Sequence, residues 1–236
     1  MPSYLDAFYE RRDGLVFITP QQASDFAKSV AGDFNPLHDP DNRRFCVPGD
    51  LLFCLILQHY GISQQMQFRF TNMVGANVGL VFPKQGQIYL SDNAGRIYLE
   101  AERQGEVSQD SALVDQLTRD YAAFSGQNFP HILVPLLQAK NVMVNPQRPL
   151  VMYAGMAFEF SRWPTQPPQL QFSDAQLSID GKRGDVRLKF DFLDQGQIIG
   201  RGEKQLIISG LRPYEQAVVD DLIAQYDSWK AAYTPS

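Results

Sequence analysis

One short stretch of the chain places two acid–base side chains on either side of a turn sequence. Asp33 and His38 lie five residues apart, with Asn35-Pro36 between them. Asn-Pro favours a reversal of the chain, so both side chains can reach one point in space. A carboxylate and an imidazole that share one water molecule are the minimum for general acid–base catalysis. The stretch therefore predicts an acid–base pair, although the same residues would also suit a purely structural turn.

The segment before this turn has the pattern of an amphipathic helix. Thr19, Pro20 and Gln22 fit the N-cap, the first helical position and the capping box of a helix start. Apolar residues then recur at helical spacing, at Ala23, Phe26, Ala27 and Val30. Gly32 is a typical C-terminal stop, so we expect the helix to end directly before Asp33.

A second helix is expected from Leu51 to Tyr60, after Pro48-Gly49-Asp50 and before Gly61. Residues 51–57 are all apolar, and a helix that is apolar on every side is buried. We therefore expect this helix to lie in the core with a sheet around it.

The rest of the sequence predicts two successive blocks of helices followed by strands. In the first block, turn signals separate short β-rich runs at residues 14–19, 66–70, 76–82, 87–90 and 95–104. In the second block we expect helices at 112–124 and 132–144, then strands at 150–160, 169–179, 184–194 and 197–209. A final acidic amphipathic helix is expected from Pro213 to about Tyr233.

This order of elements predicts the fold class and the division of the chain. Helices followed by an antiparallel meander indicate the α+β class, and the repeated order suggests a duplication. We expect an N-terminal half at residues 1–108, a degenerate C-terminal half at 109–212, and a C-terminal helix at 213–236.

The second half lacks the acid–base sequence. Gly126 matches Gly32, but Gln127 stands in place of Asp33, and no Asn-Pro-x-His sequence follows. His131 comes directly after a proline and is expected to belong to a turn or a helix start. We therefore expect the chemistry in the first half alone.

The six residues 33–38, Asp-Phe-Asn-Pro-Leu-His, resemble the Asp-x-Asn-Pro-x-His motif of the MaoC-like, (R)-specific enoyl-CoA hydratases. The resemblance implies a hot-dog fold, here a double hot-dog in which two antiparallel β-sheet halves each wrap a buried helix. It also implies a hydro-lyase that hydrates trans-2-enoyl thioesters and, in reverse, dehydrates 3-hydroxyacyl thioesters.

The same resemblance implies a role for four residues. Asp33 would act mainly as base and His38 as proton donor on a shared water, and Asn35 would orient the pair. The N–H of Gly49, at the start of the buried helix, would hold the thioester oxygen, because a helix N-terminus favours negative charge. The implied partner is an acyl-CoA or acyl-carrier-protein thioester; no cofactor or metal is expected, and a homodimer is considered.

Two positions depart from that family. Pro48 stands where a His usually precedes the Gly, and Asp50 stands where an apolar residue is usual. An inward Asp50 would oppose negative charge on the thioester oxygen, whereas an outward Asp50 could cap the helix. Two alternatives therefore stay open: a non-catalytic acyl-thioester-binding or regulatory protein, and a thioesterase that uses Asp50. A likeness to uncharacterised bacterial proteins sharing Gly-Asp-Phe-Asn-Pro-x-His-Asp and Cys-Val-Pro-Gly-Asp adds no function.

Composition narrows the partners further. The net charge is −5, and no basic cluster exceeds Arg11-Arg12 and Arg43-Arg44, so a nucleic-acid partner is not expected. Arg43 and Arg44 suit a solvated loop or contact with the phosphates of coenzyme A or a carrier arm; with Asp50 they are the candidate substrate-binding residues. The longest apolar run, 51–57, is too short to span a bilayer, and no signal peptide is visible. We therefore expect a cytoplasmic protein.

Overall fold

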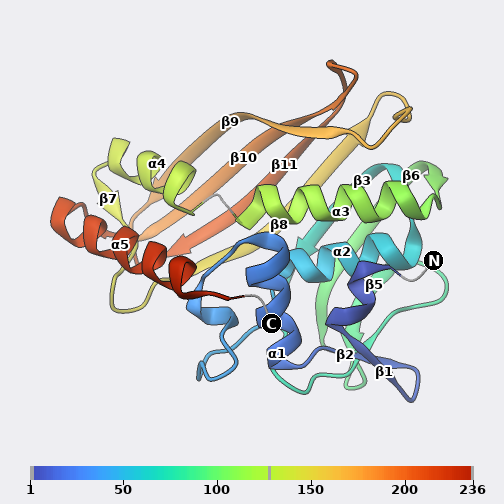
Figure 1. Ribbon diagram of the computed structural model, residues 1–236, viewed down its shortest axis with the longest axis horizontal. Helices are drawn as coiled ribbons and strands as arrows, with labels where there is room; N and C mark the ends of the chain where they lie inside the picture. The colour runs from blue at the N-terminus through green and yellow to red at the C-terminus, as the bar shows by residue number, and fades with distance from the viewer. Residues whose placement is uncertain (1–2, 127–128, 235–236) are drawn as a thin grey trace.

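The structure is a computed structural model and describes residues 3–126 and 129–234. One large antiparallel sheet has helices packed against it, with α2 and α3 side by side (Figure 1). The predicted α+β class is confirmed. The helices are η1 (Tyr4–Phe8), α1 (Pro20–Asp25), its continuation η2 (Phe26–Ala31), η3 (Pro36–His38), α2 (Gly49–Tyr60), α3 (Ser111–Gly126), η4 (Phe129–Leu133), α4 (Val134–Ala139) and α5 (Gln216–Ala232).

Ten strands form the sheet, in the order β1-β2-β4-β5-β6-β3-β8-β11-β10-β9. The strands from the first part of the chain are β1 (Glu10–Arg12), β2 (Leu15–Phe17), β3 (Ile62–Phe70), β4 (Leu80–Val81), β5 (Ile88–Asp92) and β6 (Ile97–Ser108). Those from the second part are β8 (Val151–Phe160), β9 (Gln169–Asp180), β10 (Arg183–Asp194) and β11 (Gln197–Ser209).

Four strands in each part of the sheet follow the same order. Outward from the centre, the first part runs β3-β6-β5-β4 and the second runs β8-β11-β10-β9. Among these four strands the first along the chain pairs with the last, and β2 and β1 continue the first part beyond β4 without a counterpart in the second. At the centre β3 pairs with β8, with Met66 opposite Phe158, so the sheet is continuous across the join.

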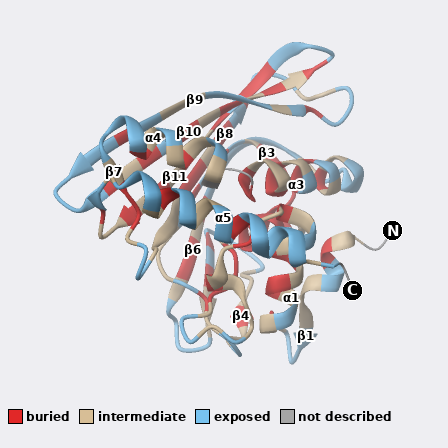
Figure 2. Ribbon diagram, turned by 60° about the vertical axis from the view of Figure 1, so that its left-hand side comes forward, coloured by how far each residue is buried: buried red, intermediate tan, exposed pale blue. Residues whose placement is uncertain are grey.

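The expected central helix is confirmed. Residues 51–57 of α2 are each at most 3% exposed. The ring of Phe53 lies 4.9 Å from that of Phe68 on β3 and 4.5 Å from that of Tyr121 on α3. Figure 2 shows buried residues concentrated where the helices meet the sheet. A helix that is apolar on every side is thus enclosed by the sheet on one side and by α3 on another.

The prediction of a second buried apolar helix at residues 132–144 is wrong in both the length and the burial of the helix. Helical structure ends with α4, and Asn141 takes a left-handed φ of 54° before strand β7 (Val142–Met143). Between residues 130 and 141, only Leu133 and Leu137 are buried. The buried apolar residues of this segment lie on one stripe of the short helix. The helix therefore packs against part of the sheet on one side and is not enclosed as α2 is. Gln127 lies outside the described residues.

Several expected boundaries also differ from the structure, and two of these differences have a clear backbone cause. The strand expected at 76–82 is reduced to β4, because Asn77 takes a positive φ of 60° that interrupts extended backbone. The final helix begins at Gln216 and not at Pro213, because Arg212–Pro213 forms strand β12 and pairs with β7.

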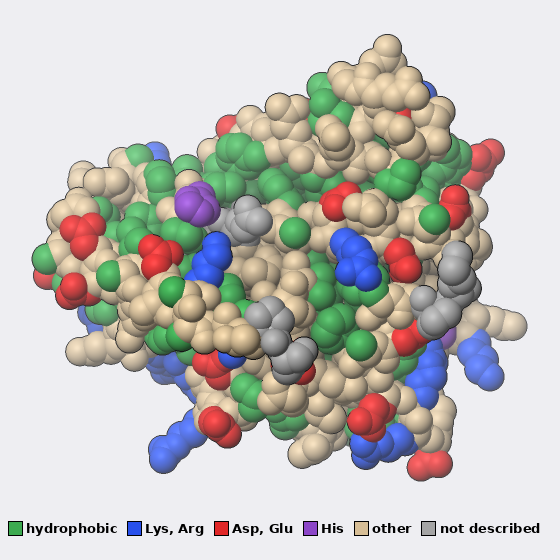
Figure 3. Space-filling view, in the orientation of Figure 1, with side chains coloured by type: hydrophobic (Ala, Val, Ile, Leu, Met, Phe, Trp, Pro, Cys, Tyr) green, Lys and Arg blue, Asp and Glu red, His purple; other side chains and the backbone are tan. Residues whose placement is uncertain are grey.

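The surface carries charges of both signs. On the face in Figure 3, Lys and Arg side chains lie among Asp and Glu side chains. Within residues 3–126 and 129–234, no helix is long and apolar enough to cross a membrane.

Candidate functional site

The turn that carries Asp33 is shaped by hydrogen bonds from backbone N–H groups to side-chain oxygens. Gly32 takes a left-handed φ of 67° and ends the helix, as its position in the sequence predicts. The Asn35 N–H donates to Asp33 Oδ1 over 2.9 Å. Asn35 Oδ1 in turn accepts from the Leu37 N–H over 3.1 Å and caps η3. The turn therefore fixes one carboxylate oxygen and leaves the other available.

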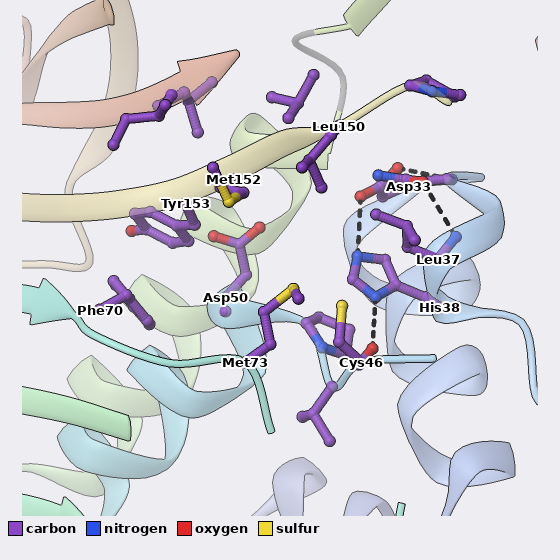
Figure 4. Close-up of a pocket in the computed structure, with 18 of the residues that line it drawn as sticks. Asp33, Leu37, His38, Cys46, Asp50, Phe70, Met73, Leu150, Met152 and Tyr153 are labelled. Carbon is purple, nitrogen blue, oxygen red and sulfur yellow. Dashed lines mark hydrogen bonds and ion pairs between the residues drawn. The ribbon is translucent and has the colours of Figure 1, made fainter. Parts of the chain in front are cut away.

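The other oxygen of Asp33 faces the ring of His38. Asp33 Oδ2 lies 3.7 Å from His38 Nε2. His38 Nδ1 lies 2.8 Å from the carbonyl oxygen of Cys46, which can only accept, so Nδ1 carries a proton (Figure 4). A separation of 3.7 Å is too long for a strong direct hydrogen bond and lets one oxygen atom lie within reach of both groups. The structure thus brings together the pair that the spacing predicts.

Both members of the pair hold protons more tightly than usual. Burial raises the pKa of Asp33, more than the neighbouring His38 lowers it. Burial alone would lower the pKa of His38, but the hydrogen bond to the Cys46 carbonyl and the Asp33 carboxylate raise it to about 9. Groups this close titrate as a unit. An imidazole and a carboxyl group that share one proton-binding site can pass a proton to and from a molecule held between them.

The pair opens into a cavity of about 800 Å³. Six of the predicted site residues line it, namely Asp33, Asn35, His38, Arg44, Gly49 and Asp50. Arg43 is exposed and is not part of this lining. Apolar side chains from several elements form much of the wall, among them Leu52, Met73, Leu133, Leu206, Leu222 and Trp229. The cavity is in the size range of sites that enclose small organic ligands, about 300–1,000 Å³.

Gly49 begins α2 at the edge of the cavity. Pro48 is the N-cap, and it supplies no side-chain cap. The N–H of Gly49 has no hydrogen-bond acceptor in the described part of the chain, as expected for the first turn of a helix. A Cβ at this position would lie 2.6 Å from the ring of Tyr153, so only glycine fits.

Asp50 points inward and does not cap the helix. Its side chain is 11% exposed and accepts a hydrogen bond from Ser125 Oγ over 2.6 Å. Lys204 Nζ lies 3.2 Å from Asp50 Oδ1 and also donates to Ser125 Oγ. Lys204 Nζ lies 4.2 Å from the ring centroid of Tyr153. The inward carboxylate is therefore paired with a buried cation from the other end of the chain.

Sequence reasoning missed Ser125, Lys204, Tyr153 and Arg96, which also line the cavity. Only Lys204 left a signal in the sequence. Along β11 the inward positions alternate, and Lys204 is in phase with the buried Leu206 and Ile208. A lysine on the buried face of a strand is expected to pair with an acidic side chain. The pattern therefore predicts a buried Asp or Glu near Lys204, but it does not say which residue that is.

Within the described residues, no group of three His, Cys, Asp or Glu side chains could hold a metal ion.

Residues 3–217 match the model of a family described as "Protein of unknown function (DUF3581)", and the chain belongs to that family. No curated protein matches it.

Three solved structures illustrate the similarity at the level of the chain trace. A putative thioesterase II from Thermobifida fusca is 11% identical, with a TM-score of 0.44, over 89% of this chain and 99% of that one. A MaoC-like dehydratase is 10% identical, with a TM-score of 0.43, over 86% and 98%. A conserved protein of unknown function with a hot dog fold from Alicyclobacillus acidocaldarius is 8% identical, with a TM-score of 0.45, over 91% and 100%. Scores below 0.5 at these identities assign neither a fold nor an activity.

Proposed function

We propose that this chain is a double hot-dog protein that hydrates trans-2-enoyl thioesters and dehydrates 3-hydroxyacyl thioesters. The fold proposal draws on the repeated strand order of the two parts of the sheet and on the enclosure of α2. In this arrangement the N-terminal half wraps a long helix, and the C-terminal half repeats the strands without one.

The function proposal draws above all on the 3.7 Å approach of Asp33 Oδ2 to His38 Nε2 at the cavity wall. A water held by both groups would lose a proton to Asp33 as its oxygen adds to C3 of the enoyl thioester. His38 would supply the proton that C2 gains. The reverse steps would release water from a 3-hydroxyacyl thioester.

Gly49 is the proposed donor to the thioester oxygen. Its N–H is unpaired within the described chain, and it starts a twelve-residue helix whose dipole favours negative charge at this end. As electrons shift from the double bond, that oxygen gains negative charge, and a preorganised donor stabilises it more than it stabilises the substrate.

The cavity mouth suits a phosphorylated carrier arm. Arg44 and Arg96 are exposed and line the cavity, from the loop after η3 and from the β5–β6 turn. Arg96 donates to Asn72 Oδ1 over 2.7 Å, which holds its guanidinium at the rim. Arginine suits phosphate groups because its planar donors bind two oxygens at once.

Thioester hydrolysis is a second candidate, with one observation in its favour. Ser125 Oγ donates to Asp50 Oδ2 over 2.6 Å, a contact of the kind made by a hydroxyl and its general base. The pairing of Asp50 with Lys204 counts against it, because both oxygens of the carboxylate are already engaged by a buried ammonium and by Ser125.

An assay of both reactions separates these candidates. Short- and medium-chain trans-2-enoyl-CoA would be followed by loss of absorbance of the conjugated thioester and, in parallel, by release of free thiol. We expect loss of the conjugated double bond without thiol release, and its abolition in Asp33→Asn. Thiol release that survives Asp33→Asn and disappears in Ser125→Ala would establish the hydrolase instead. Binding without either reaction would favour the non-catalytic alternative.

A further inference from the structure

A buried cluster of three polar side chains lies in the wall of the same cavity. Asp50 comes from the start of α2, Ser125 from the end of α3, and Lys204 from β11. As whole residues they are 8%, 6% and 5% exposed, and all three line the cavity. The acid–base mechanism above uses none of these three side chains.

The hydrogen bonds of this Asp50–Ser125–Lys204 cluster are satisfied internally. Ser125 donates to Asp50, and Lys204 donates to both. The remaining side of the ammonium faces the ring of Tyr153, 4.2 Å away. With its donors engaged, Lys204 has no N–H left to hold a substrate oxygen. Its action on the site must therefore be through its charge.

The charge of Lys204 matters because Asp50 stands next to the proposed oxygen site. Asp50 directly follows Gly49, so an unpaired carboxylate there would oppose negative charge at the Gly49 N–H. It would also face Asp33 across a cavity with a largely apolar wall, where charges are poorly screened. Asp50 raises the pKa of Asp33, and Lys204 lowers it.

We propose that Lys204, held by Ser125, is a positioning residue that neutralises the charge of Asp50. Neither the Asp33–His38 pair nor a substrate oxygen that gains negative charge then faces an uncompensated carboxylate. The part that concerns the substrate oxygen rests on the proposed function. The part that concerns Asp33 does not, because it depends only on charges present in the protein.

Three variants isolate the effect of charge from the effect of packing. Lys204→Met removes the cation and leaves Asp50 uncompensated. Asp50→Asn removes the carboxylate and keeps Lys204. The double variant Asp50→Asn/Lys204→Met removes both charges at similar volume. Lys189→Met is the matched control, because Lys189 pairs with Asp174 on strands β10 and β9, away from the cavity, with 43% of its side chain exposed.

The first measurement is the titration of Asp33 by carbon NMR in protein labelled at aspartate carboxyl carbons, with the signal assigned through Asp33→Asn. We expect the pKa of Asp33 to rise in Lys204→Met, to fall in Asp50→Asn, and to return towards the wild-type value in the double variant. Lys189→Met should leave it unchanged. A folded Lys204→Met protein with an unaltered Asp33 titration would overturn the proposal.

The second measurement is the turnover of enoyl-CoA. We expect kcat to fall on the order of 10²-fold in Lys204→Met, as for loss of one oxyanion donor, with a smaller change in KM. The double variant should regain most of this loss. A double variant as slow as Lys204→Met would show that Lys204 serves packing alone.

These readouts separate failure of the inference from failure of the proposed function. If the wild-type protein hydrates nothing, the proposed function fails, and the Asp33 titration still decides the role of Lys204. If Lys204→Met does not fold, Asp50→Asn decides it, since an unchanged Asp33 pKa in that variant contradicts the proposal.

Discussion

The two halves of the sheet share a strand order but differ in what they bring to the cavity. The N-terminal half supplies the turn at residues 33–38, with the proposed acid–base pair, and the long buried helix α2. The C-terminal half has only the short α4 where a second long helix was expected, and it contributes Ser125, Lys204 and much of the apolar wall. A half without the acid–base sequence therefore still contributes both a buried cation and apolar side chains to the cavity wall.

The halves also touch directly at the acid–base turn. A Cβ on Gly126, at the end of α3, would lie 2.0 Å from the carbonyl oxygen of Ala31 and 3.1 Å from the nitrogen of Asp33. The C-terminal half thus supports the backbone that carries Asp33, and this contact requires glycine.

The largest expected effect is the loss of activity on changing the acid–base pair. Asp33→Asn and His38→Ala should each lower the kcat of hydration about 10²–10⁴-fold, the usual contribution of a general acid or base. The double variant should be little slower than either single one, because the pair acts as a unit. His131→Ala changes the exposed histidine of the C-terminal half and should have no effect. Equal losses in His131→Ala would contradict the assignment of the chemistry to one half.

Because α2 is enclosed and α4 is covered on one side only, a truncated side chain should destabilise the protein more in α2 than in α4. Ile56→Ala in α2 removes a side chain that is fully buried and should cost about 2–5 kcal/mol in the free energy of unfolding. Leu136→Ala in α4 removes a half-buried side chain and should cost less than about 2 kcal/mol. Chemical denaturation at neutral pH measures both. Similar losses would mean that α4 is as much a core element as α2.

The raised pKa of His38 makes stability depend on pH. The folded protein keeps a proton up to a pKa of about 9 that an unfolded chain releases near 6.5. The resulting stabilisation is full below pH 6.5 and is lost as pH rises through 9, by at most about 3 kcal/mol. Denaturation curves of wild type and His38→Gln across this range should converge as pH rises. A constant difference between them would contradict the shifted pKa.

The contact at Gly126 predicts a catalytic defect far along the sequence from the acid–base residues. Gly126→Ala should push the turn at Ala31 and displace Asp33, and a misplacement of about 1 Å costs on the order of 10²-fold in kcat. Gly75→Ala is the matched control, because a Cβ there meets nothing within 4 Å. Normal kcat in a folded Gly126→Ala protein would show that the turn holds its shape without this support.

The smallest effect is expected at the cavity mouth. Arg44→Gln and Arg96→Gln should each raise KM for an acyl-CoA up to about fivefold, since exposed ion pairs contribute about 0.2–1 kcal/mol. KM for the same acyl group on N-acetylcysteamine, which has no phosphates, should not change. Arg187→Gln, on β10 away from the cavity, is the control. Equal changes for both thioesters would mean that the arginines act on the acyl group or on folding.

The sequence alone determined the features that depend on neighbours along the chain. The Asn-Pro turn between Asp33 and His38, the helix ended by Gly32 and the burial of residues 51–57 all follow from short-range rules of turn formation, capping and periodicity. The α+β class followed in the same way, from the order of elements.

Only the tertiary structure decided what surrounds those residues. The apolar content of residues 132–144 predicted a buried helix, but burial depends on how many sides of a helix are covered, and α4 is covered on one stripe. The inward direction of Asp50 could not be predicted, because its partner Lys204 is 154 residues away and comes near only when β11 pairs with β8 in the continuous sheet. Contacts at such a distance leave no local pattern beyond a lysine on the buried side of a strand. The approach of Asp33 to His38 was therefore predictable from the sequence, and the charges around the two residues were not.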